Sequence, residues 1–169
     1  MKLGALLIAA ALTVSAAFAS EPDGKAAFER LKTLAGEWEG KLKDGVTGKV
    51  SYEVISGGSA ILERSWGNGM PEGGNMVSVY HLDGNRLMMT HYCLAKNQPR
   101  LVAKSYDSEK GEIAFEFLDV TNLSGPDDGY ISGAVFHLGS DKTRFASDWS
   151  FTKAGKVAGT EKFEYTRVR

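Results

Sequence analysis

The sequence has few of the residues that cross-link small domains. Cys93 is the single cysteine in 169 residues, which excludes an internal disulfide and a structural zinc site made of cysteines. There are only 4 prolines, and the net charge is −1, so no electrostatic feature points to nucleic acid or to an anionic membrane as a partner. With 43% apolar residues the chain is too hydrophobic for a disordered protein, and it is long enough to bury its own core.

Motifs of several enzyme classes are also missing. No serine stands in a G-x-S-x-G context. The glycine pairs Gly57-Gly58 and Gly73-Gly74 are interpreted as turns between strands, because neither leads from a strand into a helix as a phosphate-binding loop does. These absences leave open whether the protein is an enzyme.

The beginning of the chain, in contrast, carries an export pattern. Lys2 precedes an apolar run at residues 3–14, the small-x-small tripeptide 17–19 follows, and polar residues come next. This order predicts a bacterial secretory signal at residues 1–19 that is cleaved. We expect residues 20–169 to form a single domain in the periplasm or outside the cell, with no membrane attachment after cleavage.

The remaining residues predict one helix followed by strands. Residues 23–35 place their apolar side chains on one stripe of a helix, and Gly36 ends it. After that the pattern has period two, and glycine or aspartate turns separate the segments. The predicted strands are 37–43, 48–56, 60–66, 75–82, 86–94, 99–106, 112–121, 131–138, 143–152 and 156–168. This spacing predicts an all-β antiparallel up-and-down barrel with the helix covering one end, with a sandwich as the alternative.

Several strands mix polar side chains with methionine and aromatic ones on the same face. Tyr80 shares a face with Ser78, and Met89 shares one with His91. A dry core would separate the two kinds of residue more cleanly. The mixture favours a barrel with a cavity that holds one small ligand.

A short motif at the start of the first strand resembles a known superfamily. Residues 36–40 read Gly-Glu-Trp-Glu-Gly directly after the helix, which resembles the opening of the calycin barrels, meaning lipocalins, fatty-acid-binding proteins and nitrobindin-like barrels. The strand count and the position of the helix are most similar to nitrobindin-like barrels and to uncharacterised exported bacterial domains of that type. Residues 90–93 and 97–100 also resemble those domains. The resemblance implies that Trp38 closes one end of the barrel, with Arg167 stacked on it.

The resemblance also raises the question of haem. Nitrobindin-like barrels bind haem through a histidine near the C-terminus, whereas the last strand of this sequence has none. We therefore expect no cofactor. A haem-binding barrel stays as an alternative, with His91 or His137 as the axial ligand.

The leading hypothesis is an exported protein that binds a small apolar or amphipathic molecule inside the barrel. His91 and Arg64 are its expected polar anchors. An inward Arg64 would pair with a ligand carboxylate, whereas an outward one would be an ordinary surface charge. The other expected lining residues are Tyr52, Tyr80, Met89, Phe117, His137 and Trp149.

Two further hypotheses stay open, an enzyme and a domain that binds no ligand. A small isomerase or hydrolase would use His91 and Cys93 for its chemistry. A domain without any ligand would have a filled core and dimerise through an edge. We expect no metal site, because no register of the hairpin around Asp83 brings His81 and His91 together on one face at metal-binding distance.

Overall fold

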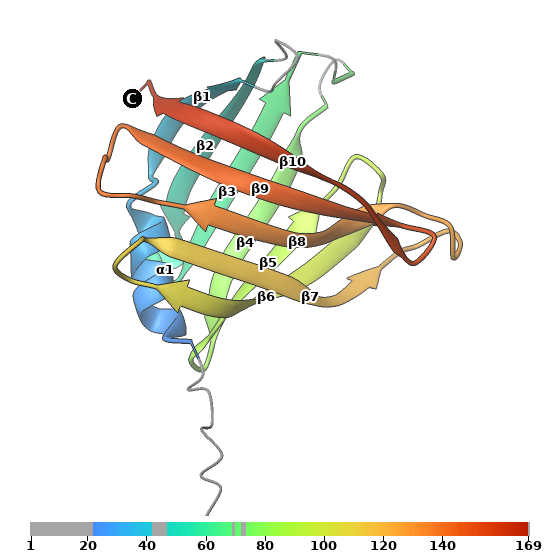
Figure 1. The fold of residues 1–169 in the computed structure, drawn as a ribbon, viewed down its shortest axis with the longest axis horizontal. Coiled ribbons are helices and arrows are strands. Elements are labelled where there is room, and N and C mark those ends of the chain that lie inside the picture. The colour runs from blue at the N-terminus through green and yellow to red at the C-terminus, as the bar shows by residue number, and fades with distance from the viewer. Residues whose placement is uncertain (1–21, 42–46, 69, 72–73, 169) are drawn as a thin grey trace, which may run out of the picture.

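The computed structural model describes residues 22–41, 47–68, 70–71 and 74–168, and it shows a closed antiparallel barrel with one short helix beside it (Figure 1). The expected signal at residues 1–19 lies outside the described residues. Within the described ranges, no helix has the length and apolar character needed to cross a membrane.

Ten strands follow the helix in an up-and-down order. Each strand pairs with its neighbour in sequence, and β1 also pairs with β10, which closes the barrel. The fold predicted from the turn pattern is therefore confirmed. The elements are α1 (Gly24–Lys32), β1 (Gly36–Lys41), β2 (Thr47–Ile55), a 3₁₀ turn (Ser56–Gly58), β3 (Ala60–Gly67), β4 (Met76–Asp83), β5 (Arg86–Tyr92), β6 (Gln98–Asp107), β7 (Glu112–Thr121), β8 (Tyr130–His137), β9 (Arg144–Lys153) and β10 (Lys156–Arg167).

Helix α1 forms because its ends are capped and its apolar stripe is buried. The Asp23 side chain accepts a hydrogen bond of 3.0 Å from the backbone N–H of Ala26. Phe28 and Leu31 are buried, and α1 contacts the strands β4 and β5. The helix ends at Lys32, earlier than expected, because the next residues make i to i−3 hydrogen bonds that tighten the last turn.

The barrel end next to α1 is closed by Trp38. This ring is buried, and its Nε1 donates a 2.7 Å hydrogen bond to the carbonyl of Leu34. The guanidinium carbon of Arg167 lies 4.1 Å from the centre of the Trp38 ring. Arg167 also donates to the backbone carbonyls of Thr33, Ala35 and Lys142. This is the arrangement that the calycin resemblance implies for the pair.

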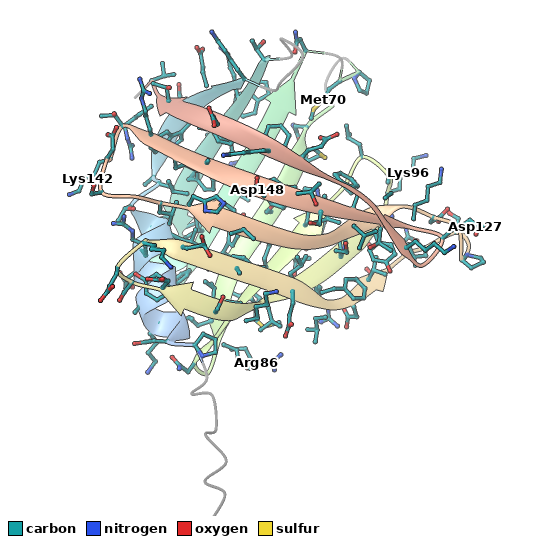
Figure 2. All side chains as sticks on the ribbon, in the orientation of Figure 1. Met70, Arg86, Lys96, Asp127, Lys142 and Asp148 are labelled. Carbon is teal, nitrogen blue, oxygen red and sulfur yellow. The ribbon has the colours of Figure 1, made fainter. Side chains whose placement is uncertain are left out.

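The two ends of the barrel differ in how they are filled. Lys142 and Arg86 mark the loops beside α1, whereas Met70, Lys96 and Asp127 mark the loops at the opposite end (Figure 2). Near α1 the interior is packed with large apolar side chains, which include Phe28, Leu34, Trp38, Leu87, Phe136 and Phe145. Free space inside the barrel is therefore expected at the opposite end.

Candidate functional site: an internal cavity

A cavity of about 390 Å³ opens inside the barrel at the end away from α1. Its volume lies within the usual range for small-molecule sites, about 300–1,000 Å³. The wall is made by the far ends of the strands, and most of it is apolar or aromatic. The lining side chains from the barrel interior are Glu63, Ser65, Met76, His91, Ile131, Trp149, Phe151, Glu161, Phe163 and Tyr165.

Glu63 is the buried acid of this cavity. It lies on β3 between the inward-facing Ile61 and Ser65, and the residue is only 4% exposed. The hydroxyl of Tyr80 donates a hydrogen bond to its Oε2. Burial raises the pKa of Glu63 to about 7, although hydrogen bonds from Tyr80 and Tyr52 lower it in part. The carboxyl group therefore changes charge near neutral pH.

His91 is the second ionisable group of the cavity. It lies on β5 and is 3% exposed, and its Nδ1 is 2.9 Å from the hydroxyl oxygen of Ser78. Burial lowers the pKa of His91 to about 4, so the ring is neutral at physiological pH. No described residue forms a hydrogen bond with its buried Nε2. This atom is left for a ligand or a water molecule, since an unpaired buried polar group costs about 1–3 kcal/mol.

The two groups stand in one row across three strands. Ser78 on β4 is the register partner of Glu63 on β3 and also of His91 on β5. Neighbouring strands are about 4.8 Å apart, which puts the backbones of Glu63 and His91 about 10 Å apart. The Trp149 ring is 5.7 Å from the His91 ring, centre to centre, and the Nε1 of Trp149 donates a 3.0 Å hydrogen bond to the hydroxyl oxygen of Ser147. A small molecule can therefore contact the acid, the imidazole and the aromatic wall together.

Of the expected lining residues, His91 and Trp149 line the cavity. Tyr52, Tyr80 and Met89 are buried inside the barrel, in the packed region rather than in the cavity wall. Tyr52 and Tyr80 instead contribute to the site through Glu63, since their hydroxyls face its carboxyl. Burial raises the pKa of both tyrosines further above the ordinary value, so they act as neutral hydroxyls.

The prediction that Arg64 is an internal anchor is wrong. Because Glu63 faces inward, the alternation along β3 places Arg64 on the outer surface, where its Nη1 lies 3.6 Å from Glu53. The cavity therefore has an acid, Glu63, where the sequence predicted a base, Arg64. A carboxylate ligand loses its expected partner.

Phe117 and His137 also lie outside the cavity lining. Phe117 stands beyond the last register pair of β7 with β8, is 38% exposed, and packs against Tyr130. A register shift after Ile131 resets the alternation of β8, so Phe136 is buried and His137 points outward. There the imidazole of His137 lies between Glu112 and Asp148, at 3.2 and 2.8 Å.

Glu63 was not predicted as a cavity residue. Both faces of β3 carry apolar and polar residues, so alternation alone did not show whether Glu63 or Arg64 points inward. The register with β4 supplies the missing information, because it sets Glu63 opposite the fully buried Ser78. Phe151 and Phe163 were also not predicted as lining residues.

The residues named in the alternative hypotheses, His91, Cys93 and His137, do not lie together in the cavity wall. Cys93 lies in the turn after β5, where its N–H bonds to the carbonyl of Asn97, and it is not among the cavity-lining residues described. Of the two histidines named for the haem alternative, His137 faces away from the cavity and His91 lines it. His81 is exposed on the outer face of β4 while His91 is buried. Within the described residues, no cluster of metal-binding side chains is found.

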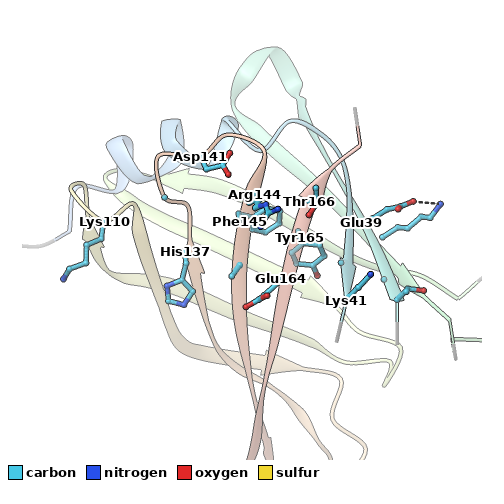
Figure 3. A pocket seen from close by; sticks show the side chains of 16 residues that line it. Glu39, Lys41, Lys110, His137, Asp141, Arg144, Phe145, Glu164, Tyr165 and Thr166 are labelled. Carbon is cyan, nitrogen blue, oxygen red and sulfur yellow. Dashed lines mark ion pairs between the residues drawn. The ribbon is translucent and has the colours of Figure 1, made fainter. Parts of the chain in front are cut away.

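A wider depression of about 860 Å³ lies on the outside, along β9, β10 and β1. Its charged groups include Lys41, Lys110, Arg144, Asp141 and Glu164, which are exposed. Figure 3 shows them spread along the wall rather than converging on one point. Charges of both signs that are open to water give little binding energy or selectivity. The internal cavity is therefore the better candidate site.

Comparisons with known proteins add information on the fold. No family model and no curated protein matches the sequence. The barrel is similar to the crystal structure of Rv2717c from M. tuberculosis, with 13% identity, a TM-score of 0.57, and coverage of 85% of this chain and 98% of that one. It is also similar to a DUF3598-family protein of unknown function from Nostoc punctiforme, with 11% identity and a TM-score of 0.53.

The match to the Nostoc protein covers 82% of this chain and 49% of that one, so the chain spans about half the length of that relative. At these identities the similarity shows a shared fold. The comparisons place this protein with other barrels of this architecture, in accord with the broad shape that the calycin resemblance implies.

Proposed function

We propose that the protein binds one small apolar or amphipathic molecule inside the barrel. The observation that carries the proposal is the cavity of about 390 Å³ with the unpaired Nε2 of His91 in its wall. Binding gains about 25 cal/mol for each Å² of apolar surface removed from water. The few polar groups of the wall then orient the ligand.

The test is to fill the cavity. Ser65 lines it from β3, so Ser65→Phe places a ring in the ligand space, whereas Arg64→Phe places the same ring on the outer surface of the same strand. Calorimetry with octan-1-ol is expected to show binding to the wild type and to Arg64→Phe, and at least a tenfold loss for Ser65→Phe. Equal binding by all three proteins would place the ligand elsewhere and contradict the proposal.

The export pattern at residues 1–19 gives the proposal its cellular setting, the periplasm or the outside of the cell. The intact mass of protein expressed in its own host is expected to correspond to a chain that begins at Ser20. Native mass spectrometry of the same sample reports any ligand that purifies with it. A full-length chain beginning at Met1 would contradict the export.

Haem is the second candidate occupant, because the unpaired Nε2 of His91 is chemically suited to be an axial ligand. A haemin titration separates it from the first. If the protein carries small apolar molecules and does not bind haem, haemin is expected to give the same Soret spectrum when it is mixed with the wild type and when it is mixed with His91→Gln. A shifted Soret band that disappears in His91→Gln would favour haem.

A further inference from the structure

Within the part of the chain that the structure describes, the buried acid of the cavity, Glu63, has no basic partner. Among the described residues, the polar groups that act on the Glu63 carboxyl are the hydroxyls of Tyr80 on β4 and Tyr52 on β2, and neither carries a positive charge. Tyr165 on β10 also faces it, and burial raises the pKa of that hydroxyl too. The row across β3, β4 and β5 adds Ser78 and the neutral His91.

The basic side chains that reach the cavity from the described residues are His91 and Lys49. Burial lowers the pKa of His91 to about 4, so it carries no charge at neutral pH. Lys49 lies at the rim, and its Nζ is 3.3 Å from Glu39 on the outer face. A second acid, Glu161, stands at the rim opposite Trp149 in the register. The charges of this wall are therefore predominantly acidic.

The rest of the cavity wall is aromatic, which favours a ligand that has both a cationic group and an apolar part. Trp149 and Phe151 come from β9, and Phe163 comes from β10. Aromatic faces attract desolvated cations by about 0.5–2 kcal/mol, in addition to the apolar area that they bury. A carboxylate in the same place would stand near Glu63, where the repulsion between like charges opposes binding.

We infer that the cavity selects small amphipathic amines over carboxylates and neutral molecules, with the ligand ammonium against Glu63 and its apolar part on the Trp149, Phe151 and Phe163 wall. This rests on the proposed function, since it names the class of ligand for the same cavity. The ammonium donates charge-assisted hydrogen bonds to the Glu63 carboxylate, and these are about twice as strong as neutral ones.

Amine binding is coupled to the ionisation of Glu63. Because the free protein holds a proton on Glu63 up to a pKa of about 7, the ammonium displaces that proton when it binds below this pH. The dissociation constant for an amine then rises about tenfold for each pH unit below 7. At pH 6 the release approaches about one proton per ligand, which calorimetry detects by repeating the titration in buffers of different ionisation enthalpy.

The experiment compares three probes with the same chain: octylamine, octan-1-ol and octanoate. At pH 8 the wild type is expected to bind octylamine at least tenfold more tightly than octan-1-ol, and octanoate most weakly. Glu63→Gln is expected to lose the preference for the amine and its proton release, while its affinity for octan-1-ol stays within about threefold and shows that the cavity is intact. Glu53→Gln is the matched control and keeps the preference, because Glu53 lies on the outer surface, where it pairs with Arg64.

The outcomes separate this inference from the function on which it rests. If octan-1-ol binds while octylamine binds no better or octanoate binds best, the amine selectivity is wrong and the binding function stands. If Glu63→Gln keeps the preference for octylamine, the assignment to Glu63 is wrong. If none of the probes binds, both the inference and the proposed function are overturned.

Discussion

At the scale of single residues, Glu63 and His91 make opposite contributions to the pH dependence of the free energy of unfolding. Glu63 keeps its proton in the folded state up to about pH 7, whereas its ordinary pKa is 4.5, so its contribution makes the fold less stable as the pH rises through this window. His91 stays neutral down to about pH 4, whereas its ordinary pKa is 6.5, so its contribution makes the fold less stable as the pH falls through that window. The two effects largely cancel where the windows overlap.

Single substitutions are expected to remove this cancellation. In Glu63→Gln the free energy of unfolding should rise with pH between about 4 and 6.5, by about 1.4 kcal/mol per pH unit, because only His91 remains. In His91→Gln it should fall between about 4.5 and 7. Urea denaturation at a series of pH values measures both slopes. Parallel curves for the wild type and both variants would show that neither group titrates differently on folding.

Gly40 is a residue whose lack of a side chain is required. A Cβ at this position would lie 2.6 Å from ring carbons of Tyr165, its partner on β10. That ring is stacked on Phe145, 4.6 Å away between centres, so it has little room to move. The second glycine of the Gly-Glu-Trp-Glu-Gly segment is therefore fixed by packing inside the barrel.

We expect Gly40→Ala to lower the free energy of unfolding by about 1–3 kcal/mol through overpacking. Gly48→Ala on the next strand is the control. Its Cβ would meet only an ordinary contact at 3.6 Å, so the change should be about 0.5 kcal/mol or less. Denaturant unfolding compares the two variants. Equal effects would mean that the Tyr165 ring moves aside without cost.

At the scale of elements, α1 and the last strand hold each other in place through Arg167. Its guanidinium donates to the carbonyls of Thr33 and Ala35, just after the helix, and stacks on Trp38 of β1. A planar group with several donors can make all these contacts at once, whereas a lysine ammonium cannot stack or form the same fork. The closed end of the barrel therefore depends on contacts between residues far apart in the sequence.

Arg167→Lys is expected to lower the free energy of unfolding by about 1–3 kcal/mol and to increase hydrogen exchange at the end of α1. Arg100→Lys is the matched control, because Arg100 pairs with Asp119 on the exposed wall and this change should have little effect. Thermal unfolding and exchange of amide hydrogens provide the two readouts. If amide hydrogen exchange at the end of α1 is unchanged in Arg167→Lys, Arg167 does not hold the helix against the last strand.

The same scale shows why the elements were predictable and the site was not. Strand bounds follow from local signals, since glycine and aspartate turns mark them, and β7 begins and ends at the predicted residues. Which face of a strand points inward depends on its partners and on bulges. The register shift after Ile131 places His137 on the outer face of β8. On β3, both faces carry polar and apolar residues, so the inward orientation of Glu63 could not be predicted from alternation. Trp149 was placed correctly in the cavity wall, because one face of its strand, β9, carries large aromatic side chains.

At the scale of the whole molecule, the barrel divides into a packed half and a hollow half. Trp38 and α1 close one end, and the core there is filled with aromatic and aliphatic side chains. The cavity, with Glu63 and His91 in its wall, occupies the other half. The packed half gives the stability that allows two ionisable groups to be buried near the cavity. In the proposed function, the ligand selectivity is therefore set by groups inside the barrel.

The most direct test of the central claim is a crystal structure with a bromine-labelled probe, 8-bromooctan-1-ol, located by anomalous scattering. We expect one bromine peak inside the barrel, against the wall formed by Trp149, Phe151 and Phe163. A peak in the outer depression beside Arg144 and Glu164, with the interior unchanged, would contradict it.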